Sequence, residues 1–162
     1  MYKLKTGTVN DVDEIWQVIE QTWLDSRTSG EERRALINLL NITHSIGKIK
    51  AEILNNYQRY VLVVEDGSAV AFASYSSTGI HEPSFKIHKI YNIPSVQGKG
   101  YNKILIRYIE ELASNRGSKQ LSVHVAENEK RIYFEALGFL AKEKSQTNHK
   151  SEQQGIEMIK IL

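Results

Sequence analysis

The residue pattern with the clearest chemical meaning lies between Ile90 and Lys103. A predicted strand there runs through a loop containing Gly98 and Gly100 into the start of a predicted helix. Backbone N–H groups of such a loop, together with the positive end of the helix dipole, form a site for a phosphate or pyrophosphate. Glycine lets the backbone approach an anion closely, and Lys99 or Lys103 would add positive charge at its edge.

The loop fits neither of two common nucleotide-binding motifs. A Walker A loop needs Gly-x-x-x-x-Gly-Lys-Ser/Thr, but Ile93 stands five positions before Gly98, and Gly100 follows Lys99. The dinucleotide fingerprint Gly-x-Gly-x-x-Gly would require glycine where Lys103 stands. On the loop alone, a glycine-bearing turn before a helix is as good an interpretation as a phosphate site.

Hydrophobic spacing predicts the elements that precede this loop. Tyr2 and Leu4 alternate with lysines in a short first strand. A helix then begins at one of three capping candidates and carries apolar side chains at three- to four-residue spacing. The candidates are Thr8, Asn10 and Asp11, and the apolar residues are Val12, Ile15, Trp16, Ile19 and Trp23. Residues 25–30 break this helix, and a second helical region at 36–54 is split by Thr43, Ser45 and Gly47.

The rest of the chain alternates strands and helices. Strands at residues 60–64 and 69–75 are joined by Asp66-Gly67, a pair typical of tight hairpin turns, which need positive φ. A strand at 85–93 leads into the loop at 94–100, and Gly117 ends an amphipathic helix at 101–116. The inward residues expected on that helix are Ile104, Leu105, Tyr108, Ile109 and Leu112. A strand at 121–125, a helix at 128–137 and strands around 140–144 and 156–161 follow, with a polar hairpin loop at 142–155.

The predicted order is β-α-α-β-β-β-α-β-α-β-β. It indicates an α/β (α+β) fold, with a mixed, largely antiparallel sheet and helices on both faces. No repeat or linker interrupts the 162 residues, so we expect a single domain over residues 1–162.

The composition excludes several classes of protein. The chain has no cysteine, which rules out a disulfide framework, zinc–thiolate sites and thiol nucleophiles. The 21 Lys and Arg against 19 Asp and Glu give a net charge of +2, too small to predict nucleic-acid binding. No apolar run approaches the ~20 residues of a membrane span, and the N-terminus does not resemble a signal peptide. We expect a soluble, cytoplasmic protein without a metal site and without nucleic-acid or membrane partners.

Residues 97–102 carry the most specific motif of the chain. Gln97-x-x-Gly100-x-Asn102 resembles the acyl-CoA signature Gln/Arg-x-x-Gly-x-Gly/Ala of the GNAT N-acetyltransferase superfamily. Thr8-x-x-Asp11, the Asp66-Gly67 hairpin, and residues 87–91 and 134–139 fall in the order of that family. The C-terminal segment 152–160 is similar to PaiA-type bacterial polyamine acetyltransferases. The resemblance implies a GNAT-like acyl-CoA N-acyltransferase fold with acetyl-CoA as co-substrate.

The same resemblance implies where acetyl-CoA binds. The backbone near Tyr91, Asn92 and Ile93 would hold the pantetheine arm and the acetyl carbonyl where two strands splay apart. The amides of the loop would hold the pyrophosphate, with contributions from Gln97, Gly98, Lys99, Gly100, Tyr101, Asn102 and Lys103. The helix at 128–137, with Asn128 and Phe134, would pass beside the thioester sulfur.

Acetyl transfer to an amine needs a base, because an ammonium has no lone pair. His88 is the preferred candidate, since it lies in the strand that leads to the loop and titrates in a suitable range. A half-buried strand histidine is an equally good interpretation. Tyr91 falls on the opposite strand face. His124 is a weaker candidate, whereas His44, His81 and His149 are expected in loops or at the surface.

Three positions depart from the family pattern. Asn102 stands where the family has Gly or Ala, and its side chain is expected to weaken binding of the phosphate. The family's asparagine before the last helix falls at Glu127, with Asn128 one position later. The tyrosine proposed as general acid falls at Phe134, so protonation of the leaving thiolate would need water or Tyr133.

These features lead to two hypotheses. The first is an N-acetyltransferase that moves an acetyl group directly from acetyl-CoA to a small amine, a polyamine or a peptide amine, since without cysteine no acyl-cysteine can form. A polycationic acceptor would need carboxylates such as Glu82, Glu127 or Glu152, each also interpretable as a solvated surface charge. The alternative is a catalytically weakened module that binds acyl-CoA and acts in regulation or interaction. The resemblance also makes a homodimer plausible.

Overall fold

The structure is a computed structural model that describes residues 1–24, 29–125, 128–142 and 155–162. The chain divides into two compact units. Unit 1 consists of Met1–Ser74 and Lys89–Ile106, and unit 2 of Tyr75–His88 and Arg107–Leu162.

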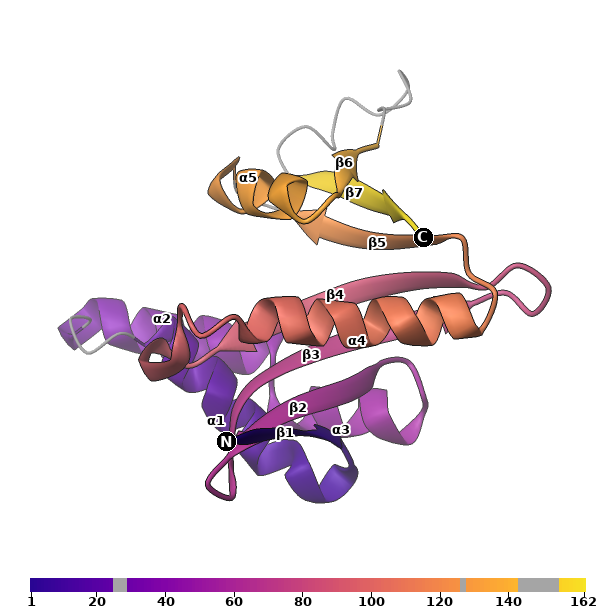
Figure 1. Ribbon diagram of the computed structural model, residues 1–162. Helices are drawn as coiled ribbons and strands as arrows, with labels where there is room; N and C mark the ends of the chain where they lie inside the picture. The colour runs from indigo at the N-terminus through magenta and orange to yellow at the C-terminus, as the bar shows by residue number, and fades with distance from the viewer. Residues whose placement is uncertain (25–28, 126–127, 143–154) are drawn as a thin grey trace. The chain divides into compact units, whose positions relative to one another are not determined.

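Strands and helices follow the predicted order closely (Figure 1). The elements are β1 (Tyr2–Thr6), α1 (Val12–Trp23), α2 (Gly30–Thr43), α3 (Ile46–Leu54), β2 (Arg59–Glu65), β3 (Ser68–Thr78), β4 (Ser84–Asn92), α4 (Tyr101–Asn115), β5 (Gln120–Val125), α5 (Asn128–Ala136), β6 (Leu140–Ala141) and β7 (Ile156–Ile161). Two short 3-10 helices, Val9–Asp11 and Pro94–Val96, precede α1 and α4. The helical region at 36–54 forms two separate helices, so the order contains one helix more than the predicted string.

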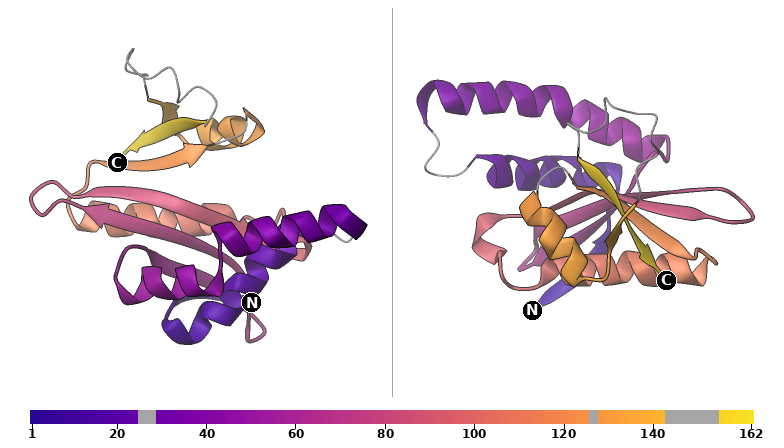
Figure 2. Two further views of the ribbon diagram at one scale, coloured as in Figure 1. Left: turned by 180° about the vertical axis from the view of Figure 1, so that it is seen from behind. Right: turned by 90° about the horizontal axis from the view of Figure 1, so that it is seen from above.

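The strands form a seven-stranded sheet in the order β1-β2-β3-β4-β5-β7-β6. The pair β4/β5 is parallel, whereas β1/β2, β5/β7 and β6/β7 are antiparallel. Within unit 1, Figure 2 shows α1 and α2 on one side of strands β1–β3 and the start of α4 on the other. The expectation of a mixed, largely antiparallel sheet with helices on both faces is confirmed.

Unit 1 has its core between the sheet and helices α1 and α3. Ile15, Ile19 and Ile49 from the helices and Tyr60 and Phe72 from the strands are all almost completely buried. The predicted period of α1 therefore identifies the face of the helix that packs against the sheet.

Of the three candidate caps before α1, Thr8 caps the 3-10 helix that leads into α1. Thr8 accepts a hydrogen bond from the Asn10 N–H at 3.3 Å, and the Asp11 carboxylate accepts one from the Thr8 N–H at 2.8 Å. The Thr8 side chain also accepts from the backbone of Asp11, so Thr8 and Asp11 form a capping box for the 3-10 helix Val9–Asp11. Asp11 is also bound by Lys5 Nζ at 2.6 Å, and although burial opposes it, these contacts hold the pKa of the carboxyl below its usual range.

The hairpin between β2 and β3 turns at Asp66 and Gly67, with φ of 50° and 82°. The prediction of a tight turn at this pair is confirmed, since both residues adopt the positive φ that such turns need.

Unit 2 has a core of Phe85, Val123, Phe139 and Met158, each 4% exposed or less. Gly117 and Gly138 follow helices α4 and α5 with φ of 83° and 96°, the conformation typical of a helix stop. In β5 the alternation is incomplete, because Ser122 is buried together with its apolar neighbours.

Three expectations about element detail were wrong or incomplete. The loop at 94–100 contains a 3-10 turn at Pro94–Val96. On α4, Ile106 is buried, whereas the expected inward residues Ile104, Tyr108 and Leu112 are only half-buried. Strand β6 ends at Ala141, and the polar hairpin loop falls largely on residues 143–154, outside the described part of the chain.

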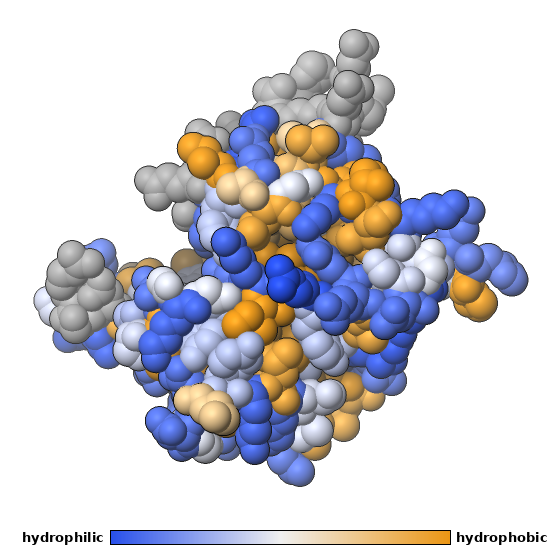
Figure 3. Space-filling model, viewed as in Figure 1, coloured by the Kyte–Doolittle hydropathy of each residue, from blue (hydrophilic) through white to orange (hydrophobic). Residues whose placement is uncertain are grey.

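The surface mixes hydrophilic and apolar residues on the face turned to the viewer in Figure 3. Among the described residues, no helix is long and apolar enough to cross a membrane. Within the same residues, no group of three or more His, Asp or Glu side chains is arranged to hold a metal ion.

Candidate active site

The glycine loop begins where β4 ends and is shaped by its own backbone. The Ile93 N–H donates to Val70 O at 3.0 Å, which fixes the start of the loop to β3. The N–H groups of Val96 and Lys99 then donate to Ile93 O and Val96 O, both at 3.1 Å. The side chain of Val96 is 3% exposed and anchors the loop in the core of unit 1.

Gly98 and Gly100 adopt φ of +89° and +83°, a region that side chains disfavour. A Cβ placed on either glycine would meet no atom within 4 Å, so the space beside both residues is open. Hydrogen bonding along α4 begins at Ile104, whose N–H donates to Gly100 O at 3.3 Å. The amides just before it are those that a helix leaves without a partner of its own. Open space, positive φ and a helix N-terminus together fit an anionic group such as a pyrophosphate.

Glu65, the last residue of β2, binds both side chains that flank Gly100. Lys99 Nζ lies 3.0 Å from Glu65 Oε1, and the Tyr101 hydroxyl donates to the same oxygen. The hydrogen bond to Glu65 raises the pKa of Tyr101 to about 12. The hydrogen bonds from Tyr101 and then Lys99 hold the pKa of Glu65 below its usual range. Glu65 is a site residue that the sequence did not indicate.

The side chain of Asn102 is turned toward β4. Its Oδ1 accepts a hydrogen bond from the Asn92 side-chain amide, which ties the N-terminus of α4 to the end of β4. The Asn92 carbonyl in turn accepts a hydrogen bond from the Thr22 hydroxyl at 3.0 Å. Asn102, which stands where the family has Gly or Ala, therefore uses its side chain to bind another residue of the protein. Of the other predicted loop residues, Gln97 and Lys103 are exposed.

Tyr91 packs against the core of unit 1 from β4. Its ring lies 5.6 Å from that of Phe72, and its hydroxyl is 3.5 Å from Nε2 of His44. Burial raises the pKa of Tyr91. His44 follows α2 and is half-buried, with its ring edge-to-face against Trp23 at 5.5 Å. His44 lies in the loop between α2 and α3, as expected, but it is half-buried rather than at the surface, and burial lowers its pKa to about 4.

A second polar cluster in unit 1, formed by Lys89, Glu52 and Tyr60, was also missed by sequence reasoning. Lys89 Nζ lies 2.9 Å from Glu52 Oε1 and 2.7 Å from the Tyr60 hydroxyl. The Lys89 and Glu52 side chains are only 11% and 17% exposed. Burial lowers the pKa of Lys89. Because side chains alternate along a strand, Lys89 and Tyr91 lie on the same face of β4. This is the only signal in the sequence that we find for the position of Lys89.

His88 lies in unit 2, exposed, with its Nε2 2.6 Å from Ser76 Oγ on β3. It therefore sits in a different environment from Tyr91, as expected from strand alternation. The registered pairs of β4 with β5 are Phe85–Leu121, Lys86–Ser122 and Ile87–Val123, and β4 runs five residues further, to Asn92. His124 is exposed on β5, opposite Glu157 in register.

On helix α5, the residues that were predicted to lie near the thioester have different surroundings from one another. Phe134 is 4% exposed and packs edge-to-face on Phe139 at 5.5 Å, so it serves the core of unit 2. Tyr133 is 36% exposed, with its ring 5.5 Å from that of Phe134. Asn128 is the first residue of the helix.

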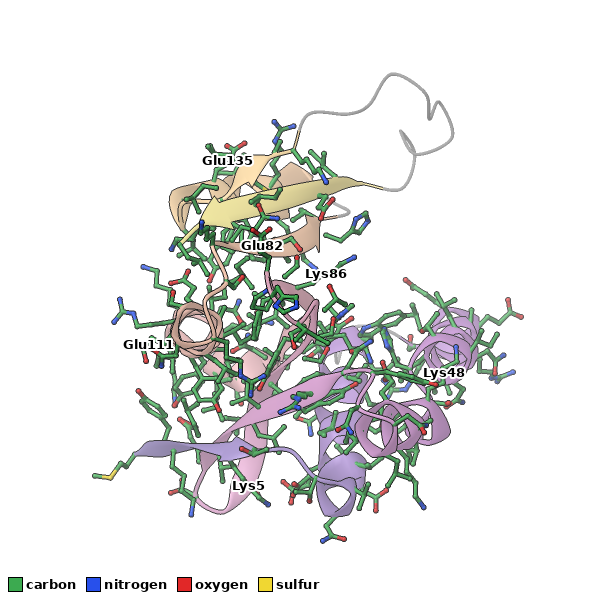
Figure 4. All side chains as sticks on the ribbon, turned by 90° about the vertical axis from the view of Figure 1, so that its right-hand side faces the viewer. Lys5, Lys48, Glu82, Lys86, Glu111 and Glu135 are labelled. Atoms are coloured by element: carbon green, nitrogen blue, oxygen red, sulfur yellow. The ribbon has the colours of Figure 1, made fainter. Side chains whose placement is uncertain are left out.

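The remaining predicted residues lie in a loop or outside the described residues. His81 and Glu82 are exposed on the connection from β3 to β4, where Figure 4 labels Glu82. Glu127, His149 and Glu152 fall outside the described residues, so their predicted roles stay predictions.

Known structures share this fold over nearly the whole chain. A PaiA N-acetyltransferase from Thermoplasma acidophilum in complex with coenzyme A superposes with a TM-score of 0.79 and 13% identity, covering 100% of this chain and 99% of that one. A probable acetyltransferase from Staphylococcus epidermidis gives 0.73 and 15%, covering 99% of each chain. A ribosomal-protein-alanine N-acetyltransferase from Brucella melitensis biovar Abortus gives 0.68 and 13%, covering 92% and 99%. Identities this low establish the fold alone.

The sequence itself has no significant match among curated proteins. Residues 13–139, however, match the sequence pattern of the Acetyltransferase (GNAT) family. That match spans more than half of the chain and includes the glycine loop. The chain therefore belongs to the acetyltransferase (GNAT) family and is an acyltransferase that uses acetyl-CoA.

Proposed function

We propose that this protein transfers an acetyl group directly from acetyl-CoA to a primary amine, on a small molecule or a peptide. The observation that carries the proposal is the loop at Gly98 and Gly100, with its positive φ values and the open space beside both residues. Acetyl-CoA, when bound, supplies an activated acetyl thioester. The loop amides and the N-terminus of α4 would hold its pyrophosphate.

The stretch of β4 around Tyr91, Asn92 and Ile93 is proposed to bind the pantetheine arm through its backbone. The Ile93 N–H already donates to Val70 O, and the Asn92 carbonyl already accepts from Thr22. Contacts to the arm would therefore use the other backbone groups of these residues. The same two bonds hold the strand end in place, which favours a fixed position for the acetyl group.

His88 is proposed to accept the proton that the acceptor amine must lose. Its Nε2 is occupied by Ser76 Oγ at 2.6 Å. This contact orients the imidazole ring. The amine nitrogen then forms the new bond to the acetyl carbon, the bond from carbon to sulfur breaks, and the sulfur leaves as thiolate.

The leaving thiolate requires little help, because a thiol has a pKa of only about 8.5. Tyr133, which is 36% exposed on α5, or water is proposed to supply its proton. Phe134 has no proton to donate, and its ring is packed in the core of unit 2.

The described carboxylates Glu52 and Glu82 favour an acceptor with a single amine over a polyamine. The half-buried carboxylate of Glu52 is neutralised by Lys89 at 2.9 Å, so this cluster adds no net negative charge. Glu82 is exposed on a loop. A polycation would need several uncompensated carboxylates close together.

An acceptor panel tests the proposal. The protein is incubated with acetyl-CoA and with spermidine, single amino acids, aminoglycosides or peptides, and release of free CoA is followed. We expect saturable release with an acceptor that has one primary amine. Tight CoA binding without turnover by any acceptor would instead support the module that only binds acyl-CoA.

A further inference from the structure

A single carboxylate joins the two residues on either side of Gly100. Glu65 ends β2, and it is bound by Lys99 Nζ at 3.0 Å and 3.5 Å and by the Tyr101 hydroxyl. These contacts span 34 and 36 positions of the sequence. They connect the residues around Gly100, which has a positive φ, to β2 in the interior of the sheet.

Tyr101 is the firmer of the two attachments. Its side chain is 6% exposed, and its ring packs edge-to-face against Tyr2 of β1 at 5.4 Å. Tyr101 also begins α4, so its position sets where the first amides of the helix point. A second bond, from Asn92 to Asn102, holds the next residue of the helix to β4.

Lys99 is the looser attachment. Its side chain is 52% exposed, whereas that of Glu65 is 18% exposed. Because the ammonium is already paired with Glu65, the positive charge available to a phosphate at this edge of the loop is reduced. The backbone amides are therefore the main hydrogen-bond donors to the phosphate. The affinity that they contribute depends on how well they are aligned before the ligand binds.

We propose that Glu65 is a positioning residue for acetyl-CoA: through Tyr101 and Lys99 it holds the backbone around Gly100 so that the loop amides face the pyrophosphate. Glu65 touches no ligand in this arrangement and acts only through its two partners. The inference rests on the proposed function, because it presumes that this loop binds the pyrophosphate.

Calorimetric titration with CoA tests the inference without any acceptor. Tyr101→Phe removes one hydroxyl and keeps the ring, and Glu65→Ala removes both contacts. We expect each to weaken CoA binding about tenfold, equal to about 1.4 kcal/mol. The double variant is expected to bind no more weakly than Glu65→Ala, because Glu65→Ala already removes the contact that Tyr101→Phe breaks. Tyr57→Phe is the matched control, since Tyr57 is 68% exposed.

Dephospho-CoA separates the pyrophosphate from the 3′-phosphate. It keeps the pyrophosphate, so the variants should lose affinity for it by the same factor as for CoA. A smaller loss with dephospho-CoA would place the effect at the 3′-phosphate and overturn the inference. Thermal unfolding of each variant confirms that the fold is retained.

The remaining outcomes distinguish the two levels of the argument. Wild-type protein that binds no CoA would overturn the proposed function, and the positioning role with it. Wild-type binding together with unchanged or tighter binding by Tyr101→Phe and Glu65→Ala would overturn the positioning role alone. Additive losses in the double variant would show that the two residues act separately, which also contradicts the inference.

Discussion

Replacing Gly100 by alanine tests the pyrophosphate loop by adding a single methyl group. Gly100 has φ of +83°, and a Cβ there meets no atom within 4 Å. The protein itself therefore imposes no clash, and the cost to folding is the strain of an L-residue at positive φ, about 1–2 kcal/mol. For a chain of 162 residues this lowers the Tm by about 2–8 °C.

Gly67 supplies a control of nearly identical geometry. It has φ of +82° and also has nothing within 4 Å, but it lies in the turn between β2 and β3. Gly67→Ala should therefore lower the Tm by a similar amount and leave CoA affinity within about twofold. The two variants share the same strain and differ in whether the new methyl group stands where a ligand approaches.

Calorimetric titration with CoA gives the decisive number. We expect the Kd of Gly100→Ala to rise by at least about tenfold over that of Gly67→Ala, because the methyl group occupies the space beside the loop amides. A tenfold change corresponds to about 1.4 kcal/mol, which is about the size of one lost hydrogen bond to a charged group. Equal Kd values for the two alanine variants would show that the loop does not cradle the pyrophosphate.

Three further predictions concern the base and the buried polar groups. His88→Ala should lower kcat/KM about hundredfold and remove the acid limb of the pH–rate profile. Ser76→Ala should only shift that limb. An unchanged pH–rate profile in His88→Ala would contradict the role of His88 as base. His44 has a pKa of about 4 in the folded protein against about 6.5 unfolded, so the unfolded chain binds more protons between these values and stability falls as the pH drops through them. Since His44 is only half-buried, the loss should be about 1–3 kcal/mol by urea titration, and His44→Phe should abolish it. Lys89→Met leaves a half-buried carboxylate unpaired and should destabilise the protein by about 2–4 kcal/mol, whereas Lys142→Met, in an exposed pair, should cost less than about 1 kcal/mol.

Much of the fold could be predicted because its signals are local. The turn at Asp66 and Gly67 needs positive φ at two adjacent residues, and the sequence supplies two residue types that tolerate it. The cap of the 3-10 helix that leads into α1 depends on Thr8 and Asp11, three positions apart. The glycine loop is equally local, since Gly98 and Gly100 carry their conformation in their own residue type. The match to the family covers residues 13–139, which include this loop.

Other features could not be predicted, because they depend on partners distant in the sequence. His44 lies near a helix end, which suggests exposure, but Trp23 and Tyr91 enclose it from other elements. From the sequence, Phe134 is expected beside the thioester sulfur, without the hydroxyl of the family's tyrosine. The structure adds that its ring is part of a core with Phe139.

By itself the sequence determined the order of elements except for one helix, the glycine loop before α4 and the absence of any cysteine chemistry, since each follows from residue type and short-range spacing. Only the tertiary structure decided how the loop is held. Glu65 is one of many charged residues in the sequence, and nothing near it indicates a partner. Folding brings its carboxylate to Lys99 and Tyr101 across 34 and 36 positions. Hydrogen bonds act over a few ångströms of space rather than along the chain, so such a contact becomes visible only when β2 and α4 lie side by side.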